Sequence, residues 1–240
     1  MSTSTKHQAR VAGLLYLLAC LPAPFSLIYV PDTLIVPGNP TATASKILAS
    51  ETMFRLAMAG EVTAAIAFIF ATLALYRLFQ GVNKRNASLM VTLFAISVPI
   101  SCVNVLNEIA ALILLRGADF LSVFTRPQLD ALAFVFLRLH GYGFLVAGIF
   151  WGLWLLPFGL LVYRSGFLPR TLGVLVMINC FAYVIPSFTA MLLPQYRSVA
   201  TRIALPFLFG EAAIVLCLLI KGARELPLAE ALQTPSRMGQ

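Results

Sequence analysis

Ionisable side chains within long apolar runs are the residues of this sequence best placed to do chemistry. Glu61, Glu108 and Glu211 each lie in such a run, and Arg138 and His140 belong to a fourth, in the stretch LRLHGYGF. Placing an ionised group in hydrocarbon costs roughly 2.5 to 3.5 kcal/mol on insertion scales, so each position is a candidate functional residue. Buried carboxylates can bind a cation, carry protons or act as general acids and bases.

Helical spacing groups some of these residues on shared faces. Asn104 and Asn107 precede Glu108 in the same run, at the three- and four-residue spacing that places side chains on one face of a helix. In the next run His140 projects from a different face than Arg138. The sequence leaves open which of these two faces the interior of the protein.

Two interpretations of the ionisable set remain open. The carboxylates either line an outward-opening polar cavity, or they form a buried network with Arg55, Arg138 and Arg202 that fixes the register of the helices. The candidate cavity residues share a position within an apolar run or at its outer end. They are Arg55, Glu61, Asn104, Asn107, Glu108, Arg138, His140, Asn179, Arg202 and Glu211.

A metal site is a further way to use part of this set. Glu61, Glu108 and His140 together offer the oxygen and nitrogen ligands that zinc accepts. No HExxH, HxxxH or DxxD motif accompanies them. We therefore predict no metal and no cofactor, and we assign no catalytic residue.

The elements that position these residues are membrane-spanning helices. The 240 residues are 60% hydrophobic and only 11% charged, which is more apolar surface than a soluble core of this size can bury. A span needs roughly 20 mostly apolar residues. Residues 1–224 thus form one all-α integral membrane domain, a bundle of six transmembrane helices, and 225–240 form a flexible cytoplasmic tail. The predicted spans are about 11–30, 54–77, 87–115, 135–163, 171–193 and 202–221.

Basic residues give the chain a net charge of +8, but they lie mostly between the apolar runs. No cluster of them is interleaved with aromatic residues, so we predict the lipid bilayer as partner and no nucleic acid. Segments on one side carry ten lysines and arginines and those on the other carry four. The positive-inside rule then makes both termini cytoplasmic. The ten are Lys6, Arg10, Arg77, Lys84, Arg85, Arg164, Arg170, Lys221, Arg224 and Arg237; the four are Lys46, Arg116, Arg126 and Arg197.

Local signals predict details of the bundle. Thr125 is expected to cap a helix that starts near Pro127 and runs into the fourth span. Gly148 and Gly152 have the spacing that lets helices approach closely. Prolines inside the spans are expected to kink them: Pro22, Pro24, Pro99, Pro157, Pro186 and Pro206.

Three stretches resemble a family of bacterial polytopic membrane proteins known as a domain of unknown function. They are RVAGLLYLL at 10–18, VPGNPTATASKI with the FRL that follows it, and LHGYGFLVAGIFWGLWLLPFGLLVYRSGFLPRTLGVL at 139–175, of which YRSGFLPR is the most specific part. The resemblance covers roughly residues 10–220. It implies six spans and a bacterial inner-membrane location. It supplies no reaction, substrate or catalytic residue.

Three functions fit these observations. The first is a carrier of a small solute or ion that uses the carboxylates in an outward-facing cavity. The second is a non-catalytic accessory or sensor protein with a buried ion-pair network. The third, an intramembrane enzyme acting on a lipid-like substrate with Glu108 or His140 as acid or base, is the least favoured.

Overall fold

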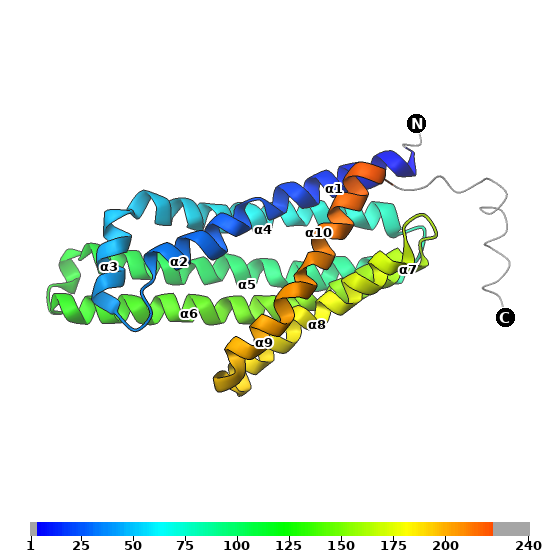
Figure 1. Cartoon of the computed structure of the whole chain (residues 1–240). Coiled ribbons are helices and arrows are strands. Elements are labelled where there is room, and N and C mark those ends of the chain that lie inside the picture. The colour runs from blue at the N-terminus through cyan, green and yellow to red at the C-terminus, as the bar shows by residue number, and fades with distance from the viewer. Residues whose placement is uncertain (1–3, 223–240) are drawn as a thin grey trace.

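The computed structural model describes residues 4–222, which form a bundle of helices with no strand (Figure 1). Six helical segments in this part of the chain are long and apolar enough to cross a membrane. This confirms the predicted six-helix membrane fold, and the predicted runs coincide with the segments to within a few residues at most ends. The expected tail at 225–240 lies outside the described residues. The six segments are Thr5–Leu34, Glu51–Phe79, Lys84–Arg116, Arg126–Arg164, Arg170–Leu192 and Pro194–Lys221.

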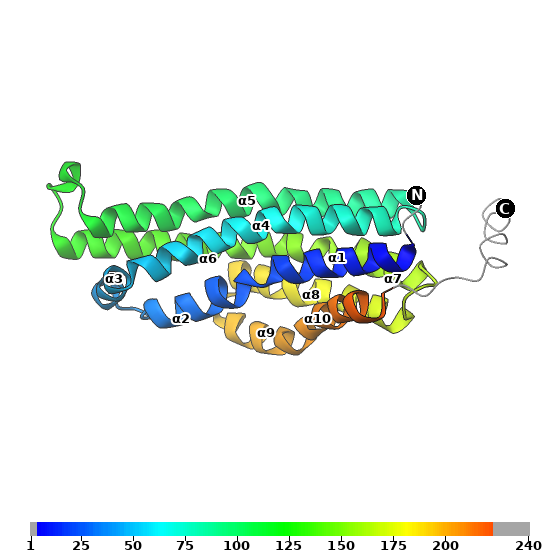
Figure 2. The ribbon, with the colours of Figure 1, turned by 90° about the horizontal axis from the view of Figure 1, so that it is seen from above.

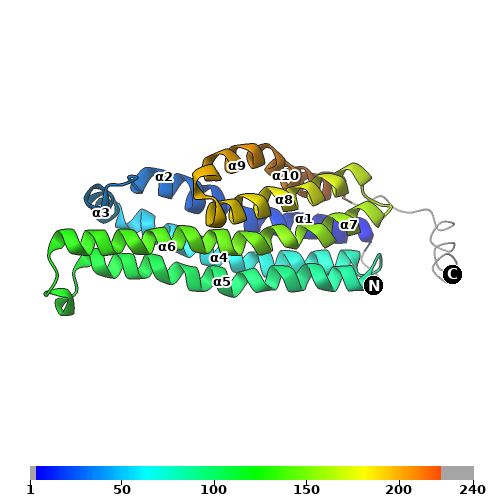
Figure 3. The ribbon, with the colours of Figure 1, turned by 90° about the horizontal axis from the view of Figure 1, so that it is seen from below.

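The long helices lie side by side along the bundle, and the C-terminal segment crosses it obliquely (Figure 1). Helices α5 and α6 run next to each other over nearly their whole length (Figure 3). The turns that follow α4 and α7 lie at the same end as the N-terminus, whereas α3 lies at the opposite end (Figure 2). The α-helices are α1 Thr5–Cys20, α2 Val30–Leu34, α3 Pro40–Ala49, α4 Glu51–Phe79, α5 Lys84–Arg116, α6 Arg126–Leu153, α7 Leu155–Arg164, α8 Arg170–Leu192, α9 Arg197–Ala204 and α10 Phe209–Leu216.

Side-chain caps define where several helices begin. Thr125 and Gln128 form a capping box at the start of α6, which confirms the predicted cap. Asn39 accepts a hydrogen bond from the backbone of Ala42 at the start of α3. Gly117 follows α5 with a φ of 70°, a conformation that glycine adopts without steric cost. These caps satisfy backbone groups that helix ends leave without partners.

Proline interrupts three of the six spans. The first span continues from α1 into a π-helix, Pro24–Tyr29, before α2. The fourth span breaks at Trp154, because Pro157 has no N–H to donate to the carbonyl four residues earlier. The last span contains a short 3₁₀ turn, Leu205–Leu208, before α10. By contrast, α5 and α8 continue as single helices through Pro99 and Pro186.

Glycine allows close backbone contact between the helices of the fourth and fifth spans. A Cβ on Gly159 of α7 would lie 2.6 Å from the carbonyl oxygen of Gly173 in α8, and one on Gly152 would lie 2.7 Å from that of Cys180. Gly148 lies against Ser187, so both glycines of the predicted spacing face α8. In the turn between α7 and α8, Ser165 accepts a hydrogen bond from the backbone of Leu168.

An aromatic core fills one half of the bundle. The rings of Trp154 and Phe158 stack with centroids 5.4 Å apart, and Tyr16 packs its ring 5.8 Å from that of Trp154. All three side chains are fully or almost fully buried. Large apolar side chains such as Val103 and Leu106 are instead exposed on the outside, where lipid is their solvent.

We predict that Gly173→Ala destabilises the protein, because the added Cβ would lie 2.7 Å from the carbonyl oxygen of Gly159 and force the backbones of α7 and α8 apart. The midpoint of thermal unfolding of the detergent-purified protein should fall. Gly141→Ala is the matched control, because Gly141 is also helical and a Cβ there meets nothing within 4 Å. Equal midpoints for the two variants would contradict the close packing.

Candidate functional site

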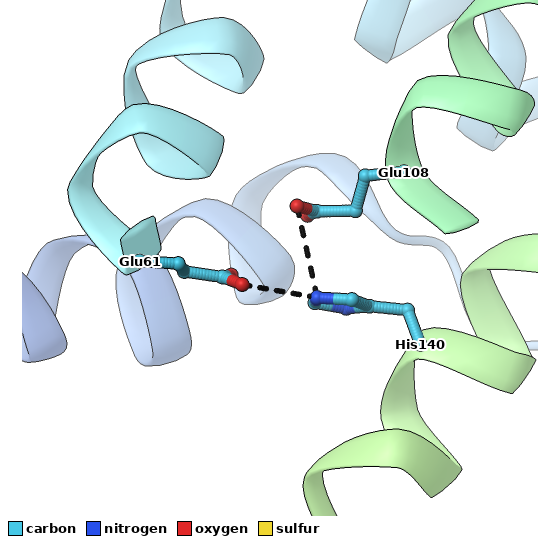
Figure 4. A group of neighbouring side chains, drawn as sticks. All are labelled: Glu61, Glu108 and His140. Atoms are coloured by element: carbon cyan, nitrogen blue, oxygen red, sulfur yellow. Dashed lines mark hydrogen bonds and ion pairs between the residues drawn. The ribbon is translucent and has the colours of Figure 1, made fainter. Parts of the chain in front are cut away.

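Glu61, Glu108 and His140 form a group that we call the acid–histidine cluster (Figure 4). Nε2 of His140 lies 3.1 Å from Oε2 of Glu61, within hydrogen-bonding distance, and 3.6 Å from Oε2 of Glu108. The side chains come from α4, α5 and α6 and point toward one another (Figure 4). Their side chains are only 6%, 7% and 11% exposed, in the order Glu61, Glu108 and His140. The cluster is therefore shielded from the surroundings of the bundle.

Contacts between α5 and α6 hold His140 in place. The side-chain amide of Asn104 donates a hydrogen bond of 2.9 Å to the backbone carbonyl of His140. Gly143 makes this approach possible, since a Cβ there would overlap the Asn104 amide. Asn107 donates in turn to the carbonyl and the side-chain oxygen of Asn104. The ring of Phe144 packs edge-on against the imidazole at 4.7 Å. The asparagines predicted to share a face with Glu108 thus position the histidine.

The cluster has more acceptor oxygens than donors. Oε1 of Glu61 and Oε2 of Glu108 are buried and form no hydrogen bond. If both carboxylates were ionised and His140 were protonated, the group would still carry one net negative charge. Buried charge without compensation is costly, so this arrangement favours binding a further cation, either a proton or a metal ion.

A second carboxylate is held by tyrosines and not by arginine. Tyr16 of α1 donates a hydrogen bond of 2.7 Å to Oε1 of Glu211, and Tyr183 of α8 donates one of 2.8 Å to Oε2. Glu211 lies in α10. We call these three residues the acid–tyrosine cluster, and it connects three helices of the bundle.

One cavity of about 220 Å³ connects the two clusters. Glu61 of the acid–histidine cluster and both Glu211 and Tyr183 of the acid–tyrosine cluster line it. Its other walls are largely aromatic and small apolar side chains, and among the described residues no lysine, arginine or histidine lines it. The polar lining residues are Cys20, Ser26, Glu61, Ser97, Ser101, Tyr183 and Glu211. Such a cavity is suited to a small, partly apolar solute that carries a donor or a positive charge.

The pairing of the three carboxylates with arginines, one of the two interpretations that the sequence left open, does not occur within residues 4–222. Arg55 lies at the end of α4, where it forms an ion pair of 2.7 Å with Glu51. Arg202 is exposed and donates to the carbonyl of Ser198 in its own helix. Arg138 is exposed on the outside of α6, while His140 turns inward. A long arginine side chain can extend toward polar surroundings at low cost, whereas the short imidazole stays in the core.

The remaining candidate, Asn179, is fully buried in α8, and its amide forms no hydrogen bond within the described chain. It packs near Gly210 and does not line the cavity.

Tyr16 is a site residue that the sequence analysis did not single out. Ala9, Ala12 and Ala19 stand at helical spacing around it, and this stripe of small residues marks the buried face of α1.

The fold and the site define an integral membrane protein of six helical spans with ionisable groups buried around an internal cavity. The chain belongs to the family described as domain of unknown function (DUF4386), whose model matches residues 11–222. It is also similar to a protein of Archaeoglobus fulgidus named only as an uncharacterized protein. The two are 29% identical over 167 residues, which are 70% of this chain and 82% of the relative. No solved structure matches the chain.

We predict that Arg138→Gln changes the free energy of unfolding by no more than about 1 kcal/mol, because the exposed guanidinium has no carboxylate partner in the described structure. Arg202→Gln should change the free energy of unfolding equally little. Equilibrium unfolding of the detergent-purified protein measures this free energy for both variants. A loss of about 3 to 5 kcal/mol would instead be typical of breaking a buried ion pair.

We also predict that Tyr183→Phe lowers the free energy of unfolding by about 1 to 3 kcal/mol, because it removes a hydrogen-bond donor from a buried carboxylate oxygen. Tyr142→Phe is the control, since the Tyr142 side chain is on the exposed face of α6. The same unfolding measurement compares them. Indistinguishable stabilities would mean that the tyrosine–carboxylate bond contributes nothing.

Proposed function

We propose that this protein is a carrier of a small solute or ion, in which the cavity binds the solute and the acid–histidine cluster binds a coupling cation. The observation that carries the proposal is the lining of the cavity. The carboxylates of Glu61 and Glu211, one from each cluster, line the cavity, and no basic side chain of residues 4–222 does. A solute with a positive charge would neutralise these groups, so the cavity favours small organic cations or amines over anions.

The size of the cavity limits the solute. A cavity of about 150 Å³ holds benzene, so by proportion a volume of about 220 Å³ suits a solute of about nine heavy atoms. The apolar walls include Phe68, Phe94 and Trp151. These side chains would pack against a carbon skeleton, and aromatic faces also attract cations.

The helices around the cavity are interrupted, as they are at the binding sites of many transporters. The π-helix Pro24–Tyr29 contributes Ser26 and Leu27 to the wall, and Trp154, at the break between α6 and α7, contributes another part. Breaks of this kind let neighbouring segments move against each other without unfolding. They support a site that opens by movement of the segments around it.

We further propose that the protein lies in the bacterial inner membrane with both termini in the cytoplasm. The distribution of basic residues supports this orientation, because ten of them belong to connections and termini on one side. The acid–histidine cluster then lies toward the extracytoplasmic half of the bundle.

A flux experiment tests the carrier. Proteoliposomes containing a pH-sensitive dye and a dye sensitive to divalent metal ions would be exposed to tetramethylammonium, choline, ethanolamine and putrescine as probes. We expect at least one of them to move protons or a divalent metal ion at a rate above that of empty vesicles, and Glu61→Gln to abolish that signal because it removes the ionisable group from the cavity wall.

Glu51→Gln is the matched control, since Glu51 belongs to the same helix but lies at the end of the bundle with Arg55 and Arg116. Its probe-dependent signal should equal that of the unaltered protein. Absence of any probe-dependent signal in the unaltered protein, or equal loss in both variants, would contradict the proposal.

A further inference from the structure

The acid–histidine cluster brings three potential metal-ligating side chains together. One ligand atom from each of Glu61, Glu108 and His140 lies within 4.8 Å of the other two. Nε2 of His140 lies 3.1 Å from Oε2 of Glu61 and 3.6 Å from Oε2 of Glu108. A tetrahedral zinc ion with ligand bonds of about 2.1 Å places its ligand atoms about 3.4 Å apart. Both separations from Nε2 of His140 are within a few tenths of an ångström of that value.

Unsatisfied oxygens supply an independent reason to expect a cation. Oε1 of Glu61 and Oε2 of Glu108 form no hydrogen bond although both side chains are more than nine-tenths buried. No arginine or lysine of the described chain forms an ion pair with either carboxylate. A divalent ion would satisfy the free oxygens and neutralise both carboxylates.

We infer that Glu61, Glu108 and His140 are the protein ligands of a divalent transition-metal ion of the zinc class, with a further coordination position directed at the cavity. This inference rests on the proposed function in one respect, since it names the cation that the cluster binds. Glu61 belongs both to the ligand set and to the cavity wall. A solute in the cavity could therefore reach the metal directly.

The chemical types of the three ligands favour some metal ions over others. Calcium takes six to eight oxygen ligands, and magnesium demands octahedral oxygen coordination with several waters. A buried set of two carboxylates and one imidazole differs from both. An imidazole nitrogen suits zinc, iron, nickel and copper, and mixed nitrogen and oxygen ligation is common for zinc.

Two contacts hold His140 in place. The Asn104 hydrogen bond fixes the backbone of His140, and Phe144 packs against its ring. A side chain that is already held in one position loses less conformational freedom when it ligates an ion.

Metal binding can be measured on the full chain in detergent, after removal of any affinity tag. We expect one equivalent of Zn²⁺ per chain by calorimetry, unaffected by a large excess of Mg²⁺ or Ca²⁺. Co²⁺ as a spectroscopic probe should give visible absorption bands of the intensity typical of four or five ligands. Zn²⁺ should also raise the midpoint of thermal unfolding of the unaltered protein, because an ion that binds only the folded state stabilises it.

Variants separate this site from adventitious binding. His140→Ala, Glu61→Gln and Glu108→Gln should each weaken Zn²⁺ binding at least about 100-fold, because the loss of a ligand exceeds that of an orienting contact. His7→Ala is the matched control, since His7 is the other histidine of the chain and is exposed. Glu211→Gln, which alters the cavity but no ligand, should also retain binding.

Three outcomes would overturn the inference: no stoichiometric Zn²⁺ binding and no thermal stabilisation by Zn²⁺, binding that survives His140→Ala, or binding that His7→Ala removes. If Zn²⁺ does not bind but flux still depends on Glu61, the coupling cation is a proton and the proposed carrier function stands. If Zn²⁺ binds as described but no probe gives a flux, the metal site stands and the carrier function fails.

Discussion

The contact between two buried carboxylates and one imidazole is the interaction on which the rest of this structure depends. Each carboxylate in the apolar interior costs several kilocalories per mole unless a neighbour compensates it. Within the described structure Glu61 and Glu108 find a compensating partner in His140, where α4, α5 and α6 meet. The close approach of α5 and α6 follows, since Gly143 leaves the space for the Asn104 amide that binds the carbonyl of His140. The three central helices are thereby fixed in register at one depth.

The acid–tyrosine cluster solves the same problem in another way. Glu211 has two hydroxyl donors, from α1 and α8, and thus ties the oblique C-terminal span to the bundle. Between the clusters the interrupted helices leave a cavity instead of a packed core, with Ser26 and Trp154 in its wall. Each cluster forms its own polar contacts beside the cavity, and the acid–histidine cluster still leaves two carboxylate oxygens without a hydrogen bond. This arrangement is more consistent with the binding of a ligand than with packing alone.

The family of this chain is described only as a domain of unknown function, so its chemistry has to be argued from the site. The site argues for a cation. Its three residues come from three helices separated in sequence, so they form no compact motif, and the usual metal signatures, which place two ligands within one helix turn, are absent from the sequence.

Much of the architecture was predictable from the sequence. The apolar runs determined six spans, Thr125 and Gln128 determined the start of α6, and Gly148 and Gly152 indicated where α6 approaches another helix. These features depend on composition or on neighbours within a few residues. The carboxylates Glu61 and Glu108 were recognisable for the same reason, because an ionisable group in an apolar run is conspicuous wherever the helix points.

Only the tertiary structure decided which residues meet those carboxylates. The sequence could not choose between Arg138 and His140, because lipid and protein interior are both apolar and the pattern of α6 does not mark its inner face. Packing against α5 turned His140 inward and Arg138 outward. Packing of α10 against α1 and α8 gave Glu211 two tyrosines in place of an arginine. The neighbouring helices determine how a membrane helix is rotated about its axis, so the sequence of that helix alone does not predict which face is buried.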